Sequence, residues 1–156
     1  MEIFEQRIIS PSDVFFIKDC EKYCAGCEKY NKTWSCPPAA DVSDGKILTD
    51  YKKALLFSVK SYKNDFKKTW ADARELTLEL RSEYMKKYKS VLAVGCSGCT
   101  VCEKCSYPEK ECLFPEKMLR PMESYSVDVF KTAEKAGLTT SSRDGNYIFF
   151  ASIFFG

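Results

Sequence analysis

The chain of 156 residues contains no histidine. Catalysis by Ser–His–Asp or Cys–His groups is therefore excluded, because both depend on an imidazole as general base. Zinc sites that include histidine are excluded for the same reason, so a soft metal would have to be held by thiolates. Glycine and proline occur in ordinary numbers, 7 and 6, and no segment is of low complexity.

Long apolar stretches are also absent. The longest, Tyr147–Phe155, is far shorter than the ~20 residues that a membrane-spanning helix needs. The N-terminal sequence MEIFEQRIISPSD has acidic residues and no apolar core behind a basic start, so it lacks the pattern of a secretory signal. We therefore expect a cytoplasmic protein without a membrane partner, in which cysteines stay reduced.

A strong charge of one sign is missing as well. The 24 basic and 22 acidic residues leave a net charge of +2, which gives no electrostatic basis for a nucleic-acid partner. The segment Gly95–Gly98 is too short for a phosphate-binding loop and lacks its lysine. With 45% hydrophobic and 29% charged residues, the composition is that of one globular domain, which we expect to span residues 1–156.

Two short apolar segments, residues 54–59 (ALLFSV) and 91–94 (VLAV), predict strands. A helix is predicted over Phe66–Lys89, where apolar residues recur at spacings of three and four: Trp70, Ala73, Leu76, Leu80, Tyr84 and Tyr88. Strand, helix and strand form a βαβ unit, so we expect parallel strands joined by a right-handed crossover. The predicted fold class is α/β, a single domain with a mixed sheet, this βαβ unit and two cysteine-rich cluster-binding loops.

The remaining elements lie at the two ends of the chain. Residues 3–9 predict a short strand, and Ser10-Pro11 predicts the start of a helix that continues to Lys18. A second helix is predicted over Met122–Ala136, with Gly137 as its stop. Residues 144–146 predict a turn, and Tyr147–Phe155 a strand buried on both faces.

Nine cysteines fall into two groups, and an odd count in a reducing compartment argues against a disulfide framework. The first group is Cys20, Cys24, Cys27 and Cys36. Its x3–x2 spacing is also that of radical-SAM enzymes, but those enzymes carry it in a much longer domain, and Cys36 adds a fourth thiolate here. The group therefore favours a complete set of four ligands.

The second group follows the predicted strand 91–94 and consists of Cys96, Cys99, Cys102, Cys105 and Cys112. Three cysteines at x2 spacing with a remote fourth resemble the ligand run of ferredoxins, in which a compact loop turns three sulfurs toward one cluster and a later segment supplies the last. Zinc stays an alternative, because four thiolates also form a good tetrahedral zinc site.

Three segments together carry a resemblance: WSCPP at 34–38, GCTVCEKCSYPEKEC at 98–112 and RPMESYSVDV at 120–129. They are similar to the domain-of-unknown-function 2284 family, whose members are described as predicted metal-binding proteins. The resemblance implies ligands at seven positions: Cys24, Cys27, Cys36, Cys99, Cys102, Cys105 and Cys112. It leaves Cys96 outside the motif and does not decide Cys20. The departures at Glu111, Met122 and Ser126 affect no ligand.

Together these patterns predict an iron–sulfur protein with two [4Fe–4S] clusters that transfers electrons to a redox partner protein. Cys20, Cys24, Cys27 and Cys36 are the predicted ligands of the first cluster, and Cys99, Cys102, Cys105 and Cys112 those of the second. Cys96 is the expected spare cysteine. Two alternatives stay open: an enzyme whose first cluster lacks the Cys20 ligand and binds a small substrate at an open iron, and a protein with structural zinc. No catalytic residue is assigned, and Glu123 is either a helix-dipole partner, an acceptor near a cluster or an acid.

Overall fold

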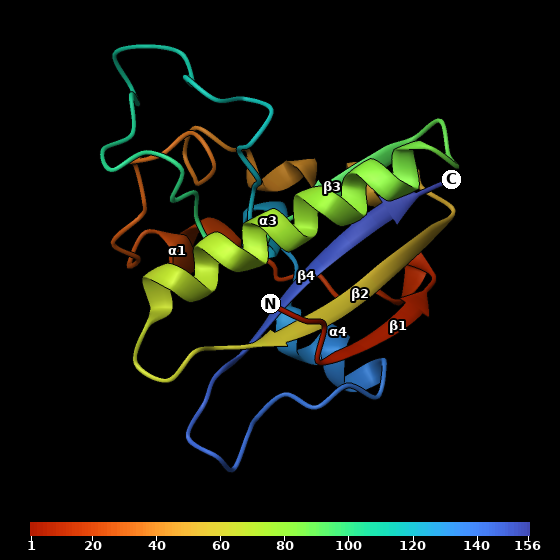
Figure 1. The fold of residues 1–156 in the computed structure, drawn as a ribbon. Coiled ribbons are helices and arrows are strands. Elements are labelled where there is room, and N and C mark those ends of the chain that lie inside the picture. Colours follow the sequence, from red (N-terminus) through yellow and green to blue (C-terminus); the bar gives the residue numbers. More distant parts are fainter.

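Four strands form one sheet in the computed structural model, which describes all residues 1–156. The strands are β1 (Glu5–Ile9), β2 (Lys53–Lys60), β3 (Val91–Val94) and β4 (Ile148–Phe155), in the spatial order β1-β2-β4-β3. All three pairings between neighbouring strands are antiparallel. The helix α3 (Phe66–Met85) lies across this sheet (Figure 1). The predicted α/β class is thus confirmed.

The predicted mixed sheet is wrong in its pairing. Strands β2 and β3 run in the same direction and are joined through α3, but they are not neighbours, because β4 lies between them and is antiparallel to both. The last strand occupies the interior of the sheet for a hydrophobic reason. Seven of the eight residues of β4 are buried. In the interior of the sheet, neighbouring strands on both edges form hydrogen bonds with the β4 backbone, and protein covers both faces of the strand.

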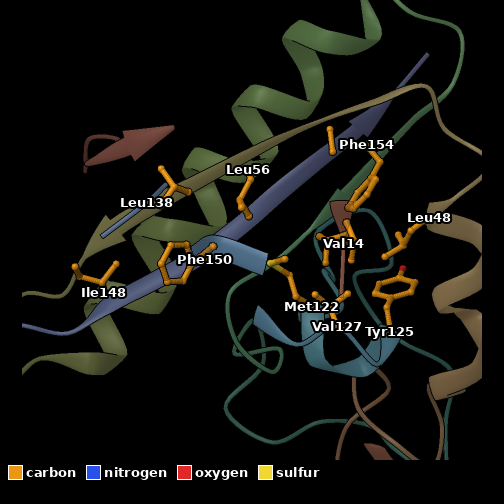
Figure 2. Packing of buried hydrophobic residues seen from close by; sticks show 13 residues of the cluster. Val14, Leu48, Leu56, Met122, Tyr125, Val127, Leu138, Ile148, Phe150 and Phe154 are labelled. Carbon is orange, nitrogen blue, oxygen red and sulfur yellow. The ribbon is translucent and has the colours of Figure 1, made fainter. Parts of the chain in front are cut away.

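The sheet is covered on both faces, and alternate residues of each central strand point to opposite sides. On the first face, Leu55, Phe57 and Val59 of β2 pack with Ala73 of α3 and with alternate residues of β4. Figure 2 shows the second face, where Leu56 and Phe154 pack with residues from short helices and connecting loops, including Val14, Leu48, Met122, Tyr125 and Val127. Burial on both faces explains why neither strand shows an alternating sequence pattern.

The helices are shorter than the sequence pattern predicts. Helix α3 begins after Asp65, whose carboxylate accepts a hydrogen bond of 2.9 Å from the backbone N–H of Lys68, and it ends at Met85 instead of Lys89. The predicted helix 122–136 is broken into η3 (Met122–Tyr125) and α4 (Val129–Lys135). The break occurs because Ser126 adopts a left-handed backbone with φ of 64°, after which Asp128 caps a new helix.

The N-terminal helix is likewise reduced to one turn. Ser10 caps η1 (Pro11–Asp13) as predicted, but the chain becomes extended at Val14 and does not continue as a helix to Lys18. Three further short elements follow: α1 (Cys20–Cys24), η2 (Val42–Asp44) and α2 (Gly45–Leu48). No helix combines the length and the apolar character needed to cross a membrane.

Two long segments, residues 25–41 and 95–121, contain almost no regular structure. They lie side by side at the end of the sheet where β3 terminates, beside α1 (Figure 1). The indole N–H of Trp34 donates to the carbonyl oxygen of Lys110 at 3.0 Å, and the Tyr107 hydroxyl donates to the Asn31 side chain at 2.7 Å. These contacts hold together the two segments that carry most of the cysteines.

Candidate metal centre

A cavity of about 360 Å³ opens between α1, the loop after β3 and η3. The four cysteines of the predicted first set all line it: Cys20, Cys24, Cys27 and Cys36. Their local structure explains this convergence. Cys20 and Cys24 are one turn apart on α1 and therefore share a face, and the backbone N–H of Cys27 donates to the carbonyl oxygen of Cys24 in the following turn at 2.9 Å.

The four thiols differ in their exposure to solvent. Cys20 and Cys36 are 3% and 7% exposed, whereas Cys27 lies at the open side of the cavity. The Cys20 thiol donates to the carbonyl oxygen of Glu123 at 3.4 Å, and burial raises its pKa. Burial and the neighbouring Cys20 raise the pKa of Cys24 to about 12. Without a metal ion the Cys20 and Cys24 thiols are protonated, so metal binding to them releases protons.

A fifth cysteine, Cys96, lines the same cavity. Cys96 is separated from the end of β3 by one residue, Gly95. The backbone N–H of Gly95 donates to the carbonyl oxygen of Arg120 at 2.8 Å, and this bond holds the end of the strand beside η3. Burial raises the pKa of Cys96 to about 12. Only its position in the sequence, outside the family motif, distinguishes Cys96 from the four cysteines of the first set. Its expected role as a cysteine that binds no metal stays a prediction.

The predicted second set lines a separate cavity of about 20 Å³. Cys99, Cys102, Cys105 and Cys112 all contribute, and apolar side chains that include Trp34, Phe114 and Met118 complete its walls. The four cysteines are partly exposed, and burial raises the pKa of Cys99. Each predicted set therefore converges on a cavity of its own.

One residue, Ser35, joins the two cavities. Its hydroxyl accepts a hydrogen bond of 2.8 Å from the backbone N–H of Cys99, in the second set. The same hydroxyl lies 3.5 Å from the sulfur of Cys36, in the first set, and 3.1 Å from the hydroxyl of Thr33. Ser35 is fully buried, and its hydroxyl thus contacts one cysteine of each set.

Glu123 is placed on the wall of the larger cavity by η3. Glu123 is exposed to solvent, and desolvation by the protein around the cavity raises the pKa of its carboxyl group. Arg120, close by in sequence, does not neutralise it. The Arg120 guanidinium instead forms an ion pair of 2.6 Å with Asp44 and donates to the carbonyl oxygen of Ser124 at 2.8 Å.

The thiols of each predicted set are spread around a cavity and are not gathered at one point. No three or more cysteine, aspartate or glutamate side chains stand close enough together to hold a single metal ion. The thiols instead line the two cavities, four cysteines at each. The donor set at each cavity is that of a thiolate-bound metal site, and only the first cavity has a volume comparable with that of a polynuclear cluster.

Sequence reasoning named both cysteine sets, whose role as ligands stays a prediction, but missed residues that lie beside them. The WSCPP segment contains Ser35, yet nothing in its spacing points to a bond with a loop more than sixty residues later. Trp70 reads as a core residue of α3, and it lines both the larger cavity and a smaller one beside Arg74. Only the unusual density of motifs around residues 34 and 98 could have indicated that these loops meet.

Comparison with protein families identifies the relationship. A family model described as predicted metal-binding protein (DUF2284) matches residues 7–155, nearly the whole chain, and the chain belongs to this family. Searches of curated proteins and of solved structures return no match.

Proposed function

We propose that this member of the predicted metal-binding family binds two [4Fe–4S] clusters and exchanges single electrons with a partner protein in the cytoplasm. One observation carries the proposal: two sets of four cysteines line two separate cavities, and the Ser35 hydroxyl contacts one cysteine of each set. Two redox centres whose cysteines are linked through one side chain can exchange electrons within the chain before an electron passes to the partner.

The arrangement of the thiols favours clusters over structural zinc. A tetrahedral zinc site with Zn–S bonds of ~2.3 Å requires four sulfurs within about 4 Å of one another. No group of three or more donors in this chain is gathered so tightly. A cubane is wider, and its sulfur ligands are correspondingly further apart, in keeping with thiols spread around a cavity wall.

The chain supplies the surroundings that set the potential of such a centre. A bound cluster provides the one-electron chemistry, and its potential depends on solvent exposure and on hydrogen bonds to sulfur. At the second cavity Trp34 and Phe114 line the wall, while at the first the Ser35 hydroxyl is in contact with the Cys36 sulfur. The larger, more open first cavity should therefore give its cluster a different potential from the second.

Anaerobic purification and reconstitution test the proposal. We expect a brown protein with the iron and acid-labile sulfide of two clusters per chain, and a reduced electron paramagnetic resonance spectrum split by coupling between neighbouring centres. The double variants Cys24→Ser/Cys27→Ser and Cys102→Ser/Cys105→Ser should each lose half of the iron and give an unsplit spectrum. A colourless protein that contains zinc, without iron or sulfide, would overturn the proposal in favour of structural zinc.

A second function is favoured by the size of the first cavity. Its volume of about 360 Å³ far exceeds the roughly 20 Å³ at the second set, and a fifth thiol borders it. This excess suits an enzyme whose first cluster has one iron open to a small substrate. Replacing Cys20 by Ala separates the two functions. Loss of half of the iron indicates full ligation and electron transfer, whereas unchanged iron and a spectrum that shifts with added small thiols indicate an open iron.

A further inference from the structure

An arginine on α3 lies beside the second cysteine set. Arg74 and Cys99 both line a third cavity, of about 20 Å³, together with the rest of the loop 95–100. This volume is little more than one water molecule needs, so the walls of the cavity stand close together. The guanidinium of Arg74 donates to the Thr100 hydroxyl at 3.0 Å, and Thr100 follows Cys99 directly in the sequence. The charge of Arg74 is thus fixed next to a predicted ligand of the second set.

The groups that contact Arg74 leave most of its charge unbalanced. The Thr100 hydroxyl is neutral. The ion pair with Glu75, 3.5 Å from the Nε nitrogen of Arg74, involves a carboxylate side chain that is 58% exposed and therefore screened by water. The Nε nitrogen is itself buried and forms no hydrogen bond. A buried donor without an acceptor is unfavourable, so this guanidinium is suited to a negatively charged neighbour.

Other cations near the second set are solvated or already paired. The loop that carries the set contains three exposed lysines, Lys104, Lys110 and Lys117. Arg120, at the end of the same loop, is paired with Asp44. Four thiolates bound to a metal carry a net negative charge, and one-electron reduction of an iron–sulfur cluster adds another. A nearby cation stabilises that charge most where water is partly excluded, as it is around Arg74, whose side chain is 18% exposed.

We propose that Arg74 is the counter-charge of the metal-bound thiolates of the second set, and that it raises the reduction potential of the cluster there. The inference rests on the proposed function for the metal at Cys99, Cys102, Cys105 and Cys112. Arg74 binds no metal and acts on the thiolates through its charge. Because reduction adds a negative charge, a cation beside the ligands favours the reduced state.

A redox titration followed by electron paramagnetic resonance tests the inference. It is carried out in the double variant Cys24→Ser/Cys27→Ser, where only the second set is complete, so that one potential is measured. We expect Arg74→Gln to shift the equilibrium about tenfold against reduction, a fall of ~59 mV in the midpoint potential of a one-electron couple. Arg74→Lys keeps the positive charge, and its potential should fall less than half as far.

The matched control is Arg81→Gln. Arg81 lies two turns further along α3 and donates to the backbone carbonyl oxygen of Glu116 at 2.9 Å, and its Nε nitrogen is likewise buried without a hydrogen bond. It lines none of the three cavities described above. Since interactions between more distant charges are screened, Arg81→Gln should shift the equilibrium less than about threefold.

Three results would overturn the inference: an unchanged potential in Arg74→Gln, an equal fall in Arg74→Lys, or an equal fall in Arg81→Gln. Far-ultraviolet circular dichroism confirms that each variant is folded. If Arg74→Gln is unfolded, Arg74→Met takes its place, because methionine also removes the charge and packs well in a partly apolar site.

Iron and acid-labile sulfide are measured on the same samples, so a protein without clusters refutes the proposed function independently. The variants are then compared in the iron-free, reduced protein by their affinity for Zn²⁺, in competition with a chelator. Binding about tenfold weaker in Arg74→Gln, and less than about threefold weaker in Arg74→Lys and Arg81→Gln, still supports the counter-charge. Unchanged affinity in Arg74→Gln, or no Zn²⁺ binding to the second set, overturns it.

Discussion

Replacing Ser35 by alanine tests the link between the two cysteine-bearing loops. The Ser35 hydroxyl is fully buried and contacts three groups: the Cys99 backbone N–H at 2.8 Å, the Thr33 hydroxyl at 3.1 Å and the Cys36 sulfur at 3.5 Å. Alanine fills nearly the same space and removes only the hydroxyl. The variant therefore isolates the polar connection from the packing.

The expected loss follows from the groups left behind. An unpaired donor costs ~1–3 kcal/mol when buried. Cys99 is partly exposed, so water can recover some of its bond, whereas Thr33 is only 5% exposed. We expect Ser35→Ala to lower the free energy of unfolding by about 2 kcal/mol, roughly a thirty-fold change in the folding equilibrium.

Urea denaturation of the iron-free, reduced protein measures this loss, with the free energy extrapolated linearly to zero urea. Ser97→Ala is the matched control. The Ser97 hydroxyl donates only to the carbonyl oxygen of the next residue, Gly98, at 3.2 Å, and its removal should cost less than about 0.5 kcal/mol. A loss in Ser35→Ala no larger than in Ser97→Ala would refute the conclusion that this hydroxyl joins the loops.

Three further changes test the scaffold. Arg120→Lys should cost about 2 kcal/mol in urea denaturation, because an ammonium group cannot reproduce the several directed bonds of the guanidinium. Gly45→Ala should cost ~1–3 kcal/mol, since its new methyl group overlaps a carbonyl oxygen of η3, while Gly26→Ala, at an ordinary contact distance of 3.7 Å, should be tolerated. The ion pair with Lys60 holds the Asp144 pKa below its usual range, so it stabilises its turn at neutral pH and is lost in acid. Amide exchange should be faster in Asp144→Asn at pH 7, with a difference that shrinks well below pH ~3.9.

Much of the local structure could be predicted from the sequence. The short runs at 54–59 and 91–94 are strands β2 and β3, and the apolar spacing in residues 66–85 is helix α3. These features depend on periodicity within a few turns, which the sequence contains directly. The helix after residue 122 was predicted as continuous because its apolar spacing does not reveal that Ser126 takes a left-handed conformation.

The sheet order could not be predicted in the same way. A strand, a helix and a strand in succession favour neighbouring parallel strands, but β4, more than fifty residues after β3, separates them. The insertion depends on which strand gains most from burial on both faces, and that is a comparison between distant segments. The prediction that β2 and β3 run in the same direction is nevertheless confirmed, because α3 connects the two strands on one side of the sheet.

The sequence by itself grouped the cysteines into two sets, each of which lines a cavity of its own, because the spacing within a loop limits which sulfurs can face a common centre. Only the tertiary structure decided what stands around them. It brings Cys96 and Glu123 to the first cavity and places Ser35 between the two sites. Those neighbours meet through packing of segments 60 to 100 residues apart, and no local pattern encodes such contacts. The volume of the first cavity follows from that packing.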